Sequence, residues 1–193
     1  MAAAERGVRV RLLIDDMNVD GMDDALRAMD AHPNLEVRLF NPGRNRDGGI
    51  RRAIEMALRF VGFNRRMHNK AWIADNRVAL VGGRNVGDEY FDASVDTNFQ
   101  DADLLLLGAA VGETSGQFDR FWNSAAVVPL GALHTAPPRW SLDDFSQHRQ
   151  QWLADAAASP WITALAGRDD LDEKLRSDDL PFHWPPSIHV VSD

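Results

Sequence analysis

Apolar residues recur along this chain with two spacings, one typical of strands and one typical of amphipathic helices. Short apolar runs bounded by turn residues predict strands at residues 8–14, 35–40, 70–74, 77–81 and 103–107. Apolar positions three or four residues apart predict helices at about residues 22–31, 49–60, 111–125 and 142–157. This alternation predicts an α/β unit. The run at 103–107 is almost wholly apolar, which is typical of a central strand.

Two of the predicted strands form a hairpin that carries the candidate chemistry. Asp75 and Asn76 are a turn pair, so the second strand returns the chain antiparallel and brings residues 82–85 back toward the start of the first. His68 and Lys70 are two residues apart on what reads as a strand, and their side chains therefore leave the same face. We predict that both groups face one pocket.

The residue types at this end of the hairpin suit phosphodiester chemistry. A neutral imidazole at His68 is a competent nucleophile toward phosphorus, and the Lys70 ammonium can hold the equatorial oxygens. Gly82 and Gly83 allow backbone N–H groups to approach an anion closely, and Asn85 adds a neutral donor. This set of groups requires neither a metal nor a cofactor.

These residues form the pattern H-x-K-x4-D-x6-G-G-x-N, which resembles the HKD signature of the phospholipase D superfamily. Further segments are similar to bacterial C-type cardiolipin synthases, namely residues 7–16, 39–42, 65–70, 82–91 and 101–108. Enzymes of that family are built from two HKD half-domains that share one active site, and they move a phosphatidyl group between lipid alcohols. The resemblance implies that residues 1–133 are one phospholipase D-like half-domain, the first, with a mixed central sheet flanked by helices.

The resemblance also implies roles for individual residues. His68 attacks the phosphodiester and becomes a phosphohistidine, while Lys70 and Asn85 hold the phosphoryl oxygens with help from the backbone of residues 82–83. Asp75 is expected to be structural, with its carboxylate capping the turn. Asp101, at the start of the next strand, is expected to accept the Nδ1 proton of the histidine and leave Nε2 free. The alternative for Asp101 is an ordinary charged residue at the start of a strand.

The mechanism needs a general acid, which typically contributes ~10² to 10⁴ in rate. The sequence contains one H-x-K motif, and in the family the acid is the histidine of the second motif in the same polypeptide. Residues 1–6 read as the tail of a helix and residues 188–193 as a strand leading into a second half. We therefore expect a half-domain truncated at its N-terminus, with the second half missing in cis or replaced by a second copy in a homodimer.

Composition narrows the choice of partner. The chain has 193 residues, 45% of them hydrophobic, and 21 basic against 29 acidic residues give a net charge of −8. Nucleic acid is an unfavourable partner, because neutralising phosphates requires clustered Lys and Arg. The absence of cysteine excludes a disulfide framework, and no apolar run is long enough to span a bilayer. A phospholipid substrate, reached from the cytoplasm or from the inner face of a bacterial membrane, fits these limits.

Two segments outside the motif bear on this interpretation. Residues 49–66 combine helically spaced apolar positions with five arginines and two phenylalanines, which is typical of a lipid-docking helix or of an ordinary helix with a solvated basic face. Residues 134–193 are rich in proline and tryptophan and predict a helical connector leading toward the second half. Its tryptophans pack on the first part or on the missing half.

Three functional hypotheses remain. The first is a phosphatidyltransferase half of the cardiolipin synthase type, inactive alone unless it dimerises. The second is a homodimeric phosphodiesterase that hydrolyses lipid or nucleic acid. The third is a fragment without catalytic activity.

Overall fold

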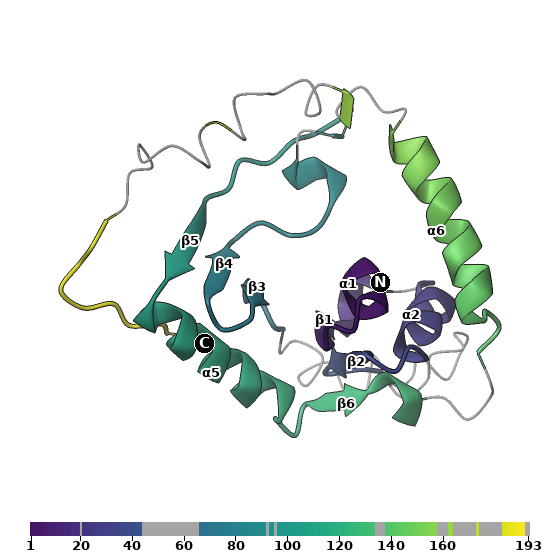
Figure 1. Ribbon diagram of the computed structural model, residues 1–193, viewed down its shortest axis with the longest axis horizontal. Helices are drawn as coiled ribbons and strands as arrows, with labels where there is room; N and C mark the ends of the chain where they lie inside the picture. Colours follow the sequence, from purple (N-terminus) through teal and green to yellow (C-terminus); the bar gives the residue numbers. More distant parts are fainter. Residues whose placement is uncertain are drawn as a thin grey trace. The chain divides into compact units, whose positions relative to one another are not determined.

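The computed structural model describes residues 1–19, 21–43, 66–91, 93–94, 96–133, 138–157, 162–163, 173 and 183–191 (Figure 1). The chain divides into two compact units. The first is Met1–His68 with Phe118–His148, and the second is Asn69–Gln117 with Arg149–Asp193. The predicted α/β class is confirmed, since both kinds of element occur along the described chain.

The first unit is built on a three-stranded mixed sheet. Its elements are α1 (Ala2–Glu5), β1 (Val10–Asp15), the 3-10 helix η1 (Asp16–Asn18), α2 (Asp23–Asp30), β2 (Leu35–Phe40), β6 (Val127–Pro129) and the 3-10 helix η3 (Leu130–Ala132). Strand β2 is central, parallel to β1 and antiparallel to β6. The predicted strand at 35–40 and helix at 22–31 are confirmed, and β1 begins two residues later than expected.

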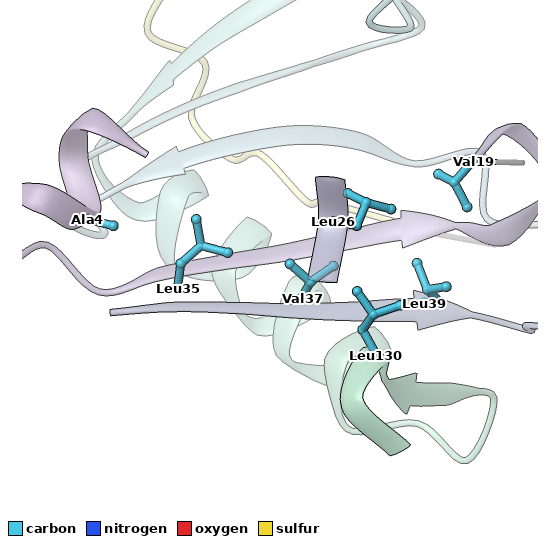
Figure 2. Close-up of a cluster of buried hydrophobic side chains, with 7 residues drawn as sticks. All are labelled: Ala4, Val19, Leu26, Leu35, Val37, Leu39 and Leu130. Carbon is cyan, nitrogen blue, oxygen red and sulfur yellow. The ribbon is translucent and has the colours of Figure 1, made fainter. Parts of the chain in front are cut away.

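The core of the first unit lies along β2. Leu35, Val37 and Leu39 alternate with more exposed Glu36 and Arg38, because successive side chains of a strand point to opposite faces. Figure 2 shows these three with the other buried members of the cluster, which are Ala4, Val19, Leu26 and Leu130. Each fully buried Leu or Val contributes roughly 1.5–3 kcal/mol, so this cluster is the main stabilising feature of the unit.

Helix α2 covers this cluster and closes an open position on β2. Asp23 and Asp24 lie in its first turn, where negative charge favours the helix dipole. At its other end the carboxylate of Asp30 accepts a hydrogen bond of 2.7 Å from the backbone N–H of Val37. Pairing with β6 ends at Arg38, so Asp30 satisfies a donor just beyond the last residue of that pairing.

The second unit contains the predicted hairpin, whose two strands lie side by side in Figure 1. Strands β3 (Lys70–Ala74) and β4 (Val78–Gly82) are antiparallel, and β5 (Asp103–Leu107) pairs antiparallel with β4. Asp75 and Asn76 have φ of 52° and 54°, and Arg77 N–H donates to the Ala74 carbonyl at 2.9 Å. This is a type I′ turn, whose twist matches that of the flanking strands. The predicted turn pair is confirmed.

The predicted position of β5 in the sheet is wrong. We expected a central strand, but among the described strands β5 lies at the edge of the order β3-β4-β5. Leu104 and Leu105, on opposite faces, are 65% and 54% exposed. A short apolar run predicts a strand but does not by itself report how many neighbours the strand has.

Two longer helices follow. Helix α5 (Ala109–Trp122) begins near the predicted position, and α6 (Leu142–Ala157) has the predicted bounds. Of the aromatic residues at the end of α5, Trp122 is buried and stacks on half-buried Phe118 at 5.6 Å between ring centroids. The ring of half-buried Phe121 lies 6.0 Å from that of Phe40. The guanidinium of Arg38 lies 4.3 Å from the Trp122 ring centroid.

The N-terminal cap of α6 explains why it begins at Leu142. Ser141 Oγ accepts from the backbone N–H of Asp144 at 3.1 Å, and the Asp144 carboxylate accepts from the Ser141 N–H at 2.8 Å. This is a reciprocal capping box with Asp in the third position. The Ser141 hydroxyl also donates to this carboxylate, and its hydrogen bond is the largest of the causes that lower the pKa of Asp144.

The last described segment differs from the prediction. We expected a strand at residues 188–193, but residues 188–191 have no regular secondary structure. Val190 instead bonds to side chains of α5: its N–H donates to Glu113 at 2.9 Å, and its carbonyl accepts from Gln117 at 3.2 Å. Side chains of α5 thus form the hydrogen bonds with the Val190 backbone that a neighbouring strand would form in the predicted sheet.

Several predictions fall outside the described residues. These are the helix at 49–60 and nearly all of the lipid-docking segment 49–66. The boundary between residues 133 and 134 stays a prediction, as does the connector role of residues 134–193. No helix within the described ranges combines the length and the apolar composition needed to cross a bilayer.

Candidate functional site

The hairpin register places Lys70 at one end of the sheet of the second unit. Lys70 is the first residue of β3 and lies opposite Gly82, the last residue of β4, which in turn lies opposite Asp103 of β5. Residues opposite one another share a face, so the side chains of Lys70 and Asp103 leave the same side of the sheet. Lys70 is half-buried, and among the described residues no acidic side chain pairs with it. Its ammonium is therefore available to an anion.

Gly82 and Gly83 lie against the start of β5. A Cβ on Gly82 would fall 2.6 Å from the Ala102 carbonyl oxygen and would overlap the carboxylate of Asp103. A Cβ on Gly83 would fall 2.5 Å from both carboxylate oxygens of Asp101. Close packing against backbone atoms therefore requires glycine at position 82, whereas at position 83 the contact is with a side chain that can rotate away. The predicted contribution of the N–H groups of both glycines to an anion stays a prediction.

Arg84 joins the glycine loop to β5. Its Nε donates to the Asp103 carboxylate at 2.8 Å, its Nη2 donates to the Asp101 carbonyl at 2.9 Å, and its Nη1 donates to the Tyr90 carbonyl. All three nitrogens of the guanidinium thus have protein acceptors, and its charge is paired with Asp103. Arg84 holds the loop in place and is committed to the protein.

Asn85 follows directly and is held by Tyr90, in the 3-10 helix η2 (Asp88–Tyr90). Its Nδ2 donates to the Tyr90 hydroxyl at 2.9 Å. Both side chains are half-buried, whereas Val86 next to Asn85 is fully exposed. The loop thus turns Asn85 inward and Val86 outward.

Asp101 lies beside this group. Its Oδ1 accepts a hydrogen bond of 2.8 Å from the Ala102 N–H, and its carboxylate covers Gly83. A carboxylate has about four lone-pair sites, so this bond leaves acceptors for a further donor. The predicted bond from Asp101 to the Nδ1 proton of His68 stays a prediction.

His68 is exposed and is the last residue of the first unit. The preceding residues are held at the end of β1, where the carboxylate of Asp15 accepts from the Met67 N–H at 2.9 Å and from Arg66 Nη1 at 3.1 Å. Asp15 is only 17% exposed. Strand β3 begins at Lys70, so His68 itself is not in the strand, and the shared face of these two side chains stays a prediction.

Asp75 occupies the first central position of the type I′ turn, at the opposite end of the hairpin from Lys70. Asp and Asn tolerate the left-handed backbone region better than most residues do. Asp75 therefore has a structural role: its left-handed backbone forms the turn that sets the register of β3 and β4.

The sequence interpretation missed four residues that support the site, namely Asp15, Arg84, Tyr90 and Asp103. Arg84 and Tyr90 lie within the quoted segment 82–91, and Asp15 and Asp103 lie at the ends of predicted strands. For Asp15 and Asp103 the available signal was the position at a strand end. Among the described residues, no group of three or more His, Asp or Glu side chains is arranged to hold a metal ion.

Comparisons with known proteins match the chain to one family and to several bacterial relatives. The family described as "Cardiolipin synthase, PLD-like domain" matches residues 1–122. The chain is 39% identical over its whole length to cardiolipin synthase C of Escherichia coli K12, of which it covers 40%. It is 41% identical over 133 residues to an uncharacterized protein of Helicobacter pylori, covering 26% of it, and 32% identical over 126 residues to a cardiolipin synthase of Staphylococcus aureus, covering 23% of it. The chain thus spans two fifths or less of the length of these relatives.

Proposed function

The chain belongs to the cardiolipin synthase family with a phospholipase D-like domain, and on that premise we propose that it supplies one HKD half of a phosphatidyltransferase. The observation that carries the proposal is the register of the hairpin. It sets Lys70 opposite Gly82, three residues before an inward-facing Asn85. An uncommitted ammonium and a fixed amide donor at one end of a sheet suit a phosphoryl group, and an exposed histidine lies two residues from that ammonium.

In the first step, Nε2 of His68 attacks the phosphorus of a phospholipid. A P–N bond forms, the P–O bond to the leaving alcohol breaks, and the leaving oxygen takes a proton from an acid. Lys70, Asn85 and the backbone N–H groups of residues 82–83 stabilise the charge that gathers on the equatorial oxygens. Asp101 accepts the Nδ1 proton of the imidazole and keeps Nε2 unprotonated for the attack.

In the second step, the hydroxyl oxygen of an acceptor lipid attacks the same phosphorus and the P–N bond breaks. The acceptor's proton passes to the group that acted as the acid. In this proposal that group is a histidine of a second HKD half in the same polypeptide. The protein acts at the inner face of the membrane, with contact through residues 49–66.

A homodimeric phosphodiesterase is the second candidate, because the sequence contains a single H-x-K motif. Two copies would then bring two His68 side chains to one site, with water as the acceptor and lipid or nucleic acid as the substrate. The two candidates differ in the second product, which is a larger phospholipid for the transferase and a phosphomonoester or phosphatidate for the hydrolase.

The test uses protein made from the complete reading frame and phosphatidylglycerol labelled in its phosphate. Turnover is quenched in alkaline denaturant, because the P–N bond of a phosphohistidine hydrolyses in acid. We expect label on a peptide that contains His68, no label and no turnover in His68→Asn, and unchanged labelling in His183→Asn, a matched change at another exposed histidine. Equal labelling of the His68→Asn protein would contradict the nucleophile assignment.

The identity of the lipid product and the oligomeric mass of the protein distinguish the remaining hypotheses. Formation of a lipid with two phosphatidyl groups supports the transferase, and release of phosphatidate by a dimer supports the hydrolase. A protein that turns over neither lipids nor a generic phosphodiester would support the noncatalytic hypothesis.

A further inference from the structure

Asn85 does not stand alone in its loop, because a hydroxyl group fixes the direction of its amide. We propose that Tyr90 is a positioning residue whose hydroxyl orients the Asn85 side chain toward the phosphoryl group. This inference rests on the proposed function. The bond that carries it runs from Asn85 Nδ2 to the Tyr90 hydroxyl oxygen at 2.9 Å, between two half-buried side chains five residues apart.

The chemistry of a primary amide explains why such a bond matters. The Nδ2 group has two N–H donors. One of them is used by the Tyr90 hydroxyl, which fixes the amide plane and leaves the second N–H to point away from Tyr90. Without the hydroxyl, the amide rotates about its last torsion, whose profile is broad, and part of the time presents its oxygen to the phosphoryl oxygens. Two oxygen acceptors facing each other repel.

Tyr90 can orient Asn85 because three contacts hold Tyr90 itself in place. Its N–H donates to the Gly87 carbonyl at 2.9 Å, its carbonyl accepts from Arg84, and its ring lies 5.2 Å from the ring of Phe99. Phe99 is tied back in turn, since its N–H donates to the Glu89 carbonyl at 2.6 Å. The hydroxyl therefore sits at the end of a ring that is held at both backbone and side chain.

Arg84 connects this loop to the sheet. It links the Tyr90 carbonyl to the carboxylate of Asp103 and to the carbonyl of Asp101. Asp103 lies opposite Gly82, and Gly82 lies opposite Lys70. The loop that holds Asn85 is therefore anchored to the same end of the sheet as the Lys70 ammonium. The Arg84 and Tyr90 pair thus sets the amide donor relative to Lys70.

The test is a double-mutant cycle in protein from the complete reading frame. Tyr90→Phe removes the hydroxyl and keeps the ring on Phe99. We expect kcat/KM for phosphodiester turnover to fall about three- to tenfold, which corresponds to about 0.7–1.4 kcal/mol and lies within the usual contribution of one hydrogen bond. In an Asn85→Ala background, Tyr90→Phe should change kcat/KM less than about twofold, because the group through which Tyr90 acts is gone. Equal falls in both backgrounds would show a purely structural role and overturn the proposal.

A second readout does not depend on activity. In protein labelled with ¹⁵N-asparagine, the side-chain amide resonances absent from Asn85→Ala identify Asn85. We expect Tyr90→Phe to shift these resonances and to weaken their response to added inorganic phosphate. Phe99→Leu removes one contact of the Tyr90 ring but keeps the hydroxyl, so it should weaken that response less than Tyr90→Phe does. Unshifted resonances in Tyr90→Phe, or an unchanged response to phosphate, would refute the inference. If the wild-type protein turns over no phosphodiester, the proposed function fails, and these resonances still decide whether Tyr90 directs Asn85.

Discussion

Replacing Gly82 by alanine separates a packing role for this glycine from a role in anion binding. The new Cβ would lie 2.6 Å from the Ala102 carbonyl oxygen and 2.9 Å from the Asp103 Cα, both of which are backbone atoms. To restore an ordinary contact of about 3.4 Å, β5 must move by about 0.8 Å from β4. That shift stretches the pairing of β4 with β5 where Gly82 lies opposite Asp103, so we expect the protein to lose stability even without substrate.

The expected size follows from two opposing effects. Overpacking of this kind costs typically about 1–3 kcal/mol. A change from glycine to alanine also lowers the entropy of the unfolded chain, which contributes about 0.4–1 kcal/mol in the stabilising direction. Overlap with backbone is the larger effect, and we expect a net loss of about 1–2 kcal/mol, with Tm lower by roughly 2–4 °C per kcal/mol.

Thermal and denaturant unfolding measure this loss, and the chain offers a matched control. Gly116 lies in α5, where a Cβ would meet nothing within 4 Å, so Gly116→Ala should leave stability unchanged or raise it by up to about 1 kcal/mol. Gly83→Ala provides a contrast, because its Cβ would meet the side chain of Asp101, which can rotate away. We expect it to lower kcat more than stability. A Gly82→Ala protein as stable as the wild type would refute the packing argument.

Three further changes test other parts of the structure. Asp15→Asn removes the negative charge of the carboxylate that accepts the hydrogen bond from the Met67 N–H. We expect the free energy of unfolding, measured in urea, to fall by about 1.5–3 kcal/mol and kcat to fall as well. An unchanged free energy of unfolding or an unchanged kcat would contradict the positioning role of Asp15. Asp75→Val places a β-branched residue at a φ of 52° and should cost about 1–2 kcal/mol relative to Asp75→Gly, and equal stability of the two variants would argue against the type I′ turn. The Ser141 hydroxyl lowers the pKa of Asp144, so this cap stabilises α6 above the ordinary pKa of an aspartate and is lost as pH falls through the lowered value. In Ser141→Ala, an NMR titration should find the pKa of Asp144 closer to its ordinary value.

The sequence predicted best the features that depend on neighbours along the chain. The alternation of Leu35, Val37 and Leu39 with polar residues located β2 at its observed bounds, because one face of that strand is buried. The Asp75 and Asn76 pair located the turn, because few residue pairs adopt two left-handed conformations in succession. Both patterns involve only neighbouring residues, so they can be recognised without knowledge of the rest of the fold.

Features that depend on distant segments were not predictable. The leucines of β5 indicated a strand but not its place at an edge, which depends on which strands pair. Glycine is needed at position 82 because Asp103 packs against it, and Asp103 lies more than twenty residues later in the sequence. No pattern in the neighbouring residues predicts that contact. Arg84 read as an ordinary variable position inside the motif, and only its three acceptors reveal that it holds the loop.

The bond between Asp30 and the Val37 N–H also bears on solubility. Where β6 stops, an unprotected strand margin would offer free donors to another chain, a common origin of edge-to-edge aggregation. The carboxylate takes up the exposed donor and adds a negative charge at the same place. A foreign strand would have to displace that carboxylate from the Val37 N–H and leave it without this partner, so the bond opposes the addition of a strand at this position.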